Sequence, residues 1–171
     1  TAYNGQAISY DGIGNPLSYR DGMSFTWQSG RQLASVTKNG AQSSYQYNGD
    51  GIRTQKVSGG VTTQYYLDGS TIVGELWGSN KLTYVYEASG QRLAMTYNGA
   101  KYYYIYNAQG DVVELFDASA RSVAKYAYDA WGNPVSITDG NGNDVSGNLN
   151  HIANINPFRY RGYYYDAETG F

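Results

Sequence analysis

A short repeat places a turn about every ten residues along this chain. The pattern Tyr-[Asp/Asn/Glu]-x-x-Gly occurs five times, and degenerate copies extend the series at a spacing near twenty residues. Asn-Gly, Asp-Gly and Gly-Gly pairs lie between most copies, and such pairs favour tight hairpin turns because both central residues need positive φ. Each repeat therefore predicts one β-hairpin. The repeat residues, with a longer copy at the end, are Tyr10, Asp11, Gly14, Tyr47, Asn48, Gly51, Tyr86, Glu87, Gly90, Tyr106, Asn107, Gly110, Tyr128, Asp129, Gly132, Tyr165, Asp166 and Gly170.

The segments between the turns have the composition of strands. KLTYVY at 81–86 and KYYYIY at 101–106 are rich in β-branched and aromatic residues that alternate with other side chains. We therefore predict an all-β fold, an antiparallel meander of about a dozen short strands. An open sheet of more than about ten strands rarely stays flat. The prediction is a curled β-sheet strip.

Tyrosine carries most of the aromatic content, with 20 Tyr against 4 Phe, and charged residues make up only 15% of the chain. A usual charged share is about 25%. We expect a tyrosine-rich sheet that is polar on both faces, which fits a shell wall better than a packed sandwich with one face of Leu, Ile, Val and Phe. With 12 basic and 14 acidic residues, the chain has no excess of positive charge of the kind that binds nucleic acid. No apolar run reaches the ~20 residues of a membrane span.

Three regions follow from this pattern. Residues 1–135 are predicted to form the repeat strip, and residues 136–156 an Asn/Gly-rich loop or insertion. Residues 157–171 resume a strand and a Tyr-Asp turn and end abruptly. A strip cut from a larger sheet leaves unpaired edge strands, so we also expect either self-association through those edges or edges blunted by the strand starts at Lys81 and Lys101.

The polar residues do not form the pattern of a catalytic or metal-binding site. His151 is the single histidine, without a convincing partner, and the chain has no cysteine. The run Asp139, Asn141, Asn143, Asp144 starts like a calcium loop, but Gly and Glu are missing where that loop needs them. Recurring carboxylates such as Glu87 are better explained as turn acceptors than as a glycosidase pair. We predict no enzyme, no metal and no cofactor.

A binding role is the alternative that the residues support. Exposed aromatic rungs on a repetitive sheet suit carbohydrate rings, and arginine beside aromatic residues suits an acidic or sugar ligand. The expected ligand contacts are Trp77, Trp131, Arg159 and Arg161. The partner would then be a glycan of the cell surface or the cell wall.

The five motif copies, together with NPFRYRGYYYDAETGF at 156–171, resemble the Rhs/YD-repeat proteins. The last segment looks like the opening of their Rhs repeat-associated core. The resemblance implies a β-sheet strip that spirals into a hollow shell. In the toxin members of this family, the shell encloses a C-terminal toxic domain, which a self-cleaving aspartyl site releases inside it.

What the resemblance implies here is architectural. The self-cleaving site resembles Asp-Pro-x-Gly-Leu, and none of Pro16, Pro134 and Pro157 follows an aspartate, so its residues are not carried over. The implied function is a non-enzymatic wall segment that encloses or presents a C-terminal toxin or cargo domain. The implied location is secreted or at the bacterial cell surface.

Overall fold

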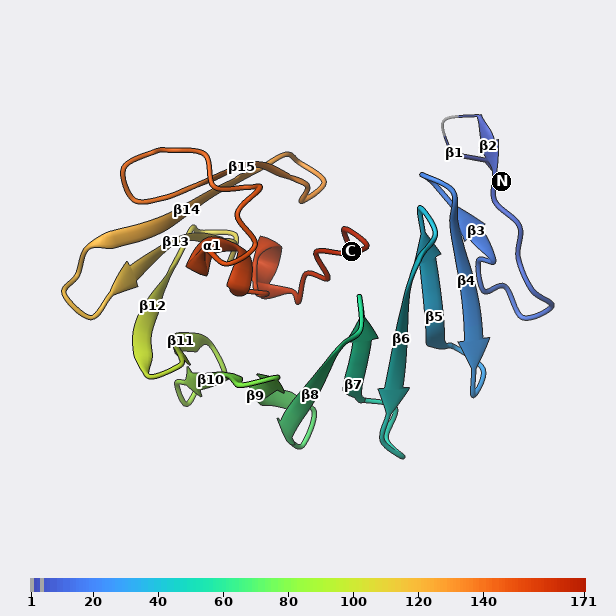
Figure 1. The fold of residues 1–171 in the computed structure, drawn as a ribbon, viewed down its shortest axis with the longest axis horizontal. Coiled ribbons are helices and arrows are strands. Elements are labelled where there is room, and N and C mark those ends of the chain that lie inside the picture. Colours follow the sequence, from blue (N-terminus) through green and yellow to red (C-terminus); the bar gives the residue numbers. More distant parts are fainter. Residues whose placement is uncertain (1, 4) are drawn as a thin grey trace. The chain divides into compact units, whose positions relative to one another are not determined.

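The fold is a computed structural model that describes residues 2–3 and 5–171. It divides into two compact units, Thr1–Asn80 and Lys81–Phe171. Within the described residues, thirteen consecutive strands, β3 to β15, occur in the order of an antiparallel meander (Figure 1). The predicted all-β class and meander topology are confirmed.

The first unit contains a separate two-stranded sheet and seven strands of the meander. Its strands are β1 (Ala2–Tyr3), β2 (Gln6–Ala7), β3 (Ser18–Tyr19), β4 (Met23–Gln28), β5 (Gln32–Lys38), β6 (Ala41–Tyr47), β7 (Arg53–Ser58), β8 (Val61–Asp68) and β9 (Thr71–Trp77). The second unit holds β10 (Asn80–Tyr86), β11 (Arg92–Tyr97), β12 (Ala100–Tyr106), β13 (Val112–Asp117), β14 (Ser122–Tyr128) and β15 (Pro134–Thr138), then the helix α1 (Ile152–Ile155) and the 3-10 turn η1 (Tyr160–Gly162).

The repeat motif forms one recurrent turn, here called the repeat turn. At Asp129, the backbone N–H donates to Asn133 O (3.0 Å), and Gly132 N donates back to Asp129 O (3.1 Å). The Asp129 carboxylate accepts from the backbone N–H groups of Trp131 and Asn133, both at 2.9 Å. The same backbone and side-chain bonds recur in the turns that begin at Asp11, Asn48, Asn107, Asp117 and Asp139.

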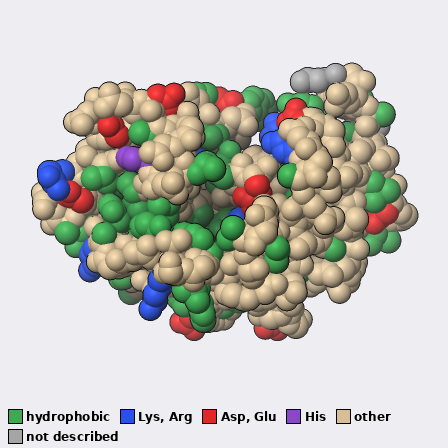
Figure 2. Space-filling model, viewed as in Figure 1, with side chains coloured by type: hydrophobic (Ala, Val, Ile, Leu, Met, Phe, Trp, Pro, Cys, Tyr) green, Lys and Arg blue, Asp and Glu red, His purple; other side chains and the backbone are tan. Residues whose placement is uncertain are grey.

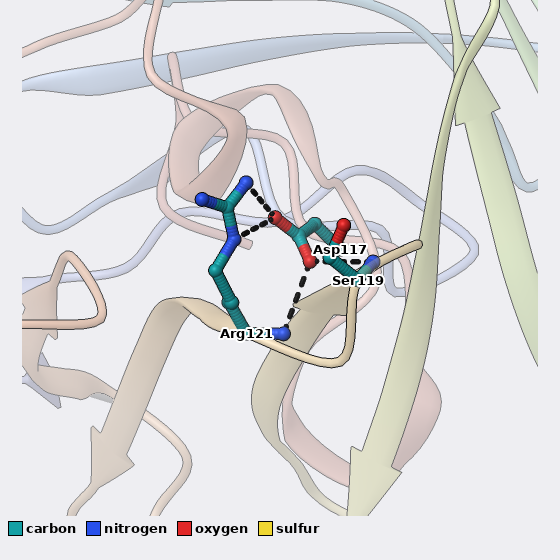
Figure 3. A network of polar contacts seen from close by, with 3 residues as sticks. All are labelled: Asp117, Ser119 and Arg121. Atoms are coloured by element: carbon teal, nitrogen blue, oxygen red, sulfur yellow. Dashed lines mark hydrogen bonds and ion pairs between the residues drawn. The ribbon is translucent and has the colours of Figure 1, made fainter.

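The turn at Asp117 shows the arrangement closely (Figure 3). Asp117 Oδ1 accepts from Ser119 N at 2.8 Å and Arg121 N at 3.0 Å, and Oδ2 accepts from Arg121 Nε at 2.9 Å. Hydrogen bonds from Arg121 lower the pKa of this carboxyl. Alanine occupies the position that glycine holds in the predicted repeats: Ala120 has a φ of +57°, whereas those glycines lie between +79° and +90°.

In the described part of the chain, six repeat hairpins carry a β-bulge next to the motif aromatic residue. Opposite Ile105 and Tyr106, for example, stand Glu114 and Val112, so Val113 is an extra residue on the returning strand. The extra residue bends the returning strand and disturbs its strict alternation. The register shifts in the same way at 26/27, 46/47, 66/67, 85/86 and 127/128.

One side of each unit is buried, unlike the expectation of two polar faces. The register places a buried aromatic residue opposite an aliphatic side chain on the next strand. These pairs are Phe25 with Val36, Tyr84 with Met95, Tyr104 with Leu115 and Tyr126 with Ile137. Cross-strand pairs of this type contribute roughly 0.2–1 kcal/mol each. The core of the first unit consists of Met23, Phe25, Val36 and Tyr45.

The stretch 136–156 contains ordered elements. It includes the end of β15 and the repeat turn at Asp139, and a bridge joins Thr138 to Asp144. Val145 N donates to Ile137 O (3.0 Å), so this stretch occupies part of the outer edge of β15. The chain then turns back across the buried side of the second unit as α1 (Figure 1).

The alanine in the Asp117 turn gives a stability prediction. A non-glycine residue in the left-handed region costs about 1–2 kcal/mol, and glycine avoids most of this cost at an entropic penalty. We expect Ala120→Gly to stabilise the protein by about 0.5–1 kcal/mol in urea unfolding. The control is Ala118→Gly in the same turn, since Ala118 has no positive φ. Equal effects of the two substitutions would contradict this account of the turn.

Candidate functional site

Six tyrosines of the second unit form two parallel rows, called here the tyrosine face. The inner row, Tyr84, Tyr104 and Tyr126, comes from β10, β12 and β14 and is 5–7% exposed. The outer row, Tyr86, Tyr106 and Tyr128, lies two residues further along the same strands and supplies the motif tyrosines. The rings of Tyr104 and Tyr106 stack at 6.1 Å, and those of Tyr126 and Tyr128 at 6.4 Å.

In four repeats, the motif aromatic residue connects its hairpin to the one before it by a hydrogen bond. Tyr106 donates its hydroxyl proton to Arg92 O (2.7 Å), and Tyr128 donates to Val112 O (2.8 Å). In the first unit, Tyr47 donates to Leu33 O (3.0 Å) and Trp27 Nε1 donates to Pro16 O (2.7 Å). Each acceptor lies two or three residues after the glycine of the preceding motif or, for Pro16, of the first motif. The repeat therefore braces its neighbour through a side-chain to backbone bond.

An arginine lies among the rings of this face. Arg92 stands opposite Tyr86 in the register, and its guanidinium carbon lies 5.5 Å from the Tyr84 ring centre and 5.7 Å from that of Tyr104. The same carbon lies 3.1 Å from the ring centre of Phe158. Arg53 repeats part of this arrangement in the first unit, where it lies over two tyrosine rings. Cation–π contacts of this kind contribute a larger stabilising free energy when they are shielded from water.

Residues 152–165, called here the C-terminal segment, cover the tyrosine face. His151 caps the N-terminus of the helix α1, and its Nδ1 accepts from Ala153 N at 3.2 Å. Tyr126 donates its hydroxyl proton to Ala153 O (2.9 Å), and the Phe158 ring meets that of Tyr84 edge-on at 4.9 Å. A backbone bond from Val112 N to Arg159 O (3.0 Å) adds to these contacts.

Asn156 is the centre of this contact and is completely buried. Its Oδ1 accepts from the Tyr104 hydroxyl (2.9 Å) and from Phe158 N (3.2 Å). Its Nδ2 donates to the Tyr126 hydroxyl (3.2 Å) and to Phe158 O (2.8 Å). A primary amide has two acceptor sites and two donor hydrogens, so all four are used. Asn156 was not among the residues predicted from the sequence, because its tyrosine partners lie 30 and 52 residues away in the chain.

The predicted ligand residues are not brought together as one group. Trp131 lies on a repeat turn and is 87% exposed, whereas Trp77 ends β9 and is half-buried. Arg159 is buried: its Nη2 donates to Ala153 O (3.2 Å), and its guanidinium lies 4.6 Å from the Tyr165 ring centre. Arg161 is exposed and lies over the Tyr160 ring, which packs against the Trp131 turn at Gly132.

The carboxylates of the motif act as turn acceptors. The Asn133 side chain and backbone hydrogen bonds lower the pKa of Asp129, and those of Asn143 do the same for Asp139. Glu87 keeps the backbone bonds of the turn, but its longer side chain accepts from Ser89 Oγ (2.7 Å). The described residues contain no group of three or more His, Cys, Asp or Glu side chains arranged to hold a metal ion.

The last motif copy forms a longer turn, as its spacing predicts. Asp166 N donates to Phe171 O (2.6 Å), five residues later, and Gly170 N donates to Asp166 O (2.8 Å).

Charged side chains are sparse on the visible surface of the molecule (Figure 2). Among the helices of the described residues, none is long and apolar enough to cross a membrane.

Comparisons with known proteins agree with this repeat structure. A family model described as RHS Repeat matches residues 106–144. The tRNA3(Ser)-specific nuclease WapA of Bacillus spizizenii is 42% identical over 178 residues, and the tRNA nuclease WapA of Bacillus subtilis is 40% identical. Each alignment covers 99% of this chain but only 7% of the relative, so the chain spans a small part of their length.

Two solved structures share the fold at low sequence identity. A chain in the crystal structure of TcdB2-TccC3-Cdc42 matches with a TM-score of 0.68 and 18% identity, over 92% of this chain and 8% of that one. The Photorhabdus luminescens Tc holotoxin pore with the TccC3 mutation D651A matches at 0.62 and 16%, also over 92% of this chain and 8% of that one. At this identity, the likeness concerns the fold alone.

The buried tyrosine row predicts a loss of stability in alkaline solution. Burial raises the pKa of Tyr126 to about 12, although the Asn156 hydrogen bond and the Arg159 charge oppose this shift. Because the folded pKa lies above the unfolded value near 10, the stabilisation is complete below pH 10 and is lost as the pH rises towards 12. The free energy of unfolding should fall by up to about 3 kcal/mol over this range. In Tyr126→Phe the fall should be shallower, and an equal fall in both proteins would contradict the assignment.

Proposed function

Because the chain belongs to the Rhs/YD-repeat family, we propose that it is a non-enzymatic wall segment of a β-shell that encloses or presents a C-terminal toxin domain of a longer protein. The observation that carries this proposal is the braced antiparallel meander, which has the fold of chains in Tc toxin structures. The nuclease names of the WapA relatives belong to proteins of which this segment spans 7%. The location that accompanies this role is outside the cell or at the bacterial surface.

The mechanism would be steric. The bonds from Tyr106 and Tyr128 connect neighbouring hairpins along the wall, so each repeat is held by the next. The C-terminal segment seals the tyrosine face from water through Asn156 and Phe158. A continuous wall of this kind would separate an enclosed domain from proteases and substrates without contacts specific to that domain.

A chimera with a curated relative tests enclosure. The aligned segment of Bacillus subtilis WapA is replaced by this chain, which is 40% identical to it. We expect the region after the segment to resist limited proteolysis in the chimera, and Gly140→Ala to remove that resistance. The reason is steric, because a Cβ at Gly140 would overlap the backbone oxygen of Ser122 in β14.

The matched control is Gly147→Ala. Gly147 has no atom within 4 Å of the added Cβ and no positive φ. Resistance should persist in this variant, as in the parent chimera. The enclosure proposal is wrong if the downstream region of the parent chimera is cut as quickly as an isolated copy of that region.

Glycan binding is a second candidate, favoured by the exposure of Trp131. Its indole is 87% exposed, and its backbone is fixed by the bond to Asp129, so the ring is presented from a rigid turn. An indole face stacks on the C–H face of a sugar ring, and the exposed Arg161 could donate to sugar hydroxyls. Arg159 would not take part directly, since its guanidinium is used inside the protein.

A cell-wall pull-down distinguishes the two candidates. If a glycan binds, Trp131→Ala should reduce retention on purified bacterial cell wall about tenfold or more, equivalent to about 1.4 kcal/mol. Tyr66→Ala, at an exposed position on β8, serves as the control and should leave retention unchanged. Retention that is absent, or equally reduced in both variants, would reject the glycan candidate and leave the wall proposal untouched.

A further inference from the structure

The C-terminal segment contacts the tyrosine face as a ligand contacts a receptor. Its buried contacts are made by residues 153–160, which meet β10, β12, β13 and β14 through side chains and one backbone bond. The preceding residues 146–150 are all exposed. An exposed loop therefore connects the segment to the sheet, and the residues that contact the tyrosine face all follow this loop in the chain.

The amide of Asn156 forms hydrogen bonds with two tyrosine hydroxyls at the same time. Tyr104 donates to Oδ1 and Tyr126 accepts from Nδ2, and these tyrosines come from strands separated by β13. An aspartate at this position has almost the same shape, but its carboxylate cannot donate to the Tyr126 hydroxyl and carries a charge into a buried site. The pair of hydroxyls therefore selects an amide over an acid of equal size.

The aromatic ring two residues later fills the second part of the contact. Phe158 is 5% exposed, and its ring lies beneath the Arg92 guanidinium at 3.1 Å and against Tyr84 at 4.9 Å. Pro157 between them has a fixed φ and favours an extended residue before it. Asn156 is indeed extended, with φ −63° and ψ 115°. The sequence Asn-Pro-Phe thus presents an amide and a ring at a set spacing.

We propose that the tyrosine face together with Arg92 is a peptide-binding site whose ligand is the Asn156-Pro157-Phe158 segment of this chain, and that binding does not need the covalent connection through residues 146–150. A cut in that exposed loop leaves the segment in place and the tyrosine face sealed. The site is specified by two hydroxyls, one guanidinium and one ring edge. This inference does not depend on an enclosed domain.

The test is cleavage of the intact chain inside the loop. A specific protease recognition sequence is inserted after Gly147, which is exposed and has open space around it. The purified protein is cut to completion and passed over a size-exclusion column at micromolar concentration in native buffer. We expect both fragments to elute together at equal molar amounts with the circular dichroism spectrum unchanged. Separation of the two fragments under these conditions would overturn the proposal.

Variants show whether the named contacts are responsible. Asn156→Asp should speed fragment dissociation about tenfold, since an unsatisfied buried partner weakens binding by roughly five- to 150-fold. Asn148→Asp is the matched control, because its side chain is exposed and only accepts, from Asn150 N at 3.2 Å. Equal dissociation rates for these two variants would also overturn the proposal.

A third substitution covers the case in which Asn156→Asp fails to fold. Phe158→Leu keeps an apolar side chain and loses the ring that lies against Arg92. It should also speed dissociation of the cleaved segment, with the dichroism spectrum of the uncut protein retained. Dissociation as slow as in the unsubstituted cut protein would show that the Arg92 and Phe158 contact does not contribute to recognition.

Discussion

A buried tyrosine must find a partner for its hydroxyl group, and the structure of the second unit depends on how this is done. Leaving a buried hydroxyl unsatisfied costs about 1–3 kcal/mol. In the outer row the hydroxyl partners are nearby in the sheet, because Tyr106 and Tyr128 donate to backbone carbonyls of the preceding hairpins. In the inner row the hydroxyl partners are far away in the sequence, because Tyr104 and Tyr126 bind Asn156 and α1. One residue type therefore connects hairpin to hairpin and sheet to covering segment.

The turns give this sheet its regular spacing. In most repeat turns an Asp or Asn side chain accepts two backbone N–H groups, as Asp129 does, and a residue with positive φ closes the turn. The bulge beside each motif tyrosine then sets how the returning strand continues. Because these features recur along the chain, the outer-row residues Tyr106 and Tyr128 reach equivalent backbone carbonyls. The local geometry of one repeat thus produces the bracing between repeats, which is the property that a wall needs.

The parts of the fold that are encoded locally could be predicted from the sequence. Asn39-Gly40 and Asn98-Gly99 have positive φ at both residues, as the hairpin prediction requires, and the strands lie where the tyrosine-rich runs predict. The bulges were not predicted, because a single extra residue leaves no mark in a short alternating pattern. The covering role of Asn156 was not predictable either, since it depends on partners far away in the chain. Arg92 left a usable signal, because Arg53 occupies the same place after the motif glycine.

The central claim is that Asn156 holds the covering segment through the hydroxyls of the tyrosine face. A double-mutant cycle of Asn156→Ala with Tyr104→Phe, read from urea unfolding, measures this coupling directly. Residues in one hydrogen-bond network couple by about 0.5–3 kcal/mol, whereas distant sites add within about 0.3–0.5 kcal/mol. The account predicts a coupling of at least about 1 kcal/mol, with additivity for Asn156→Ala and Tyr66→Phe. Additive effects in the Asn156 and Tyr104 cycle would contradict it.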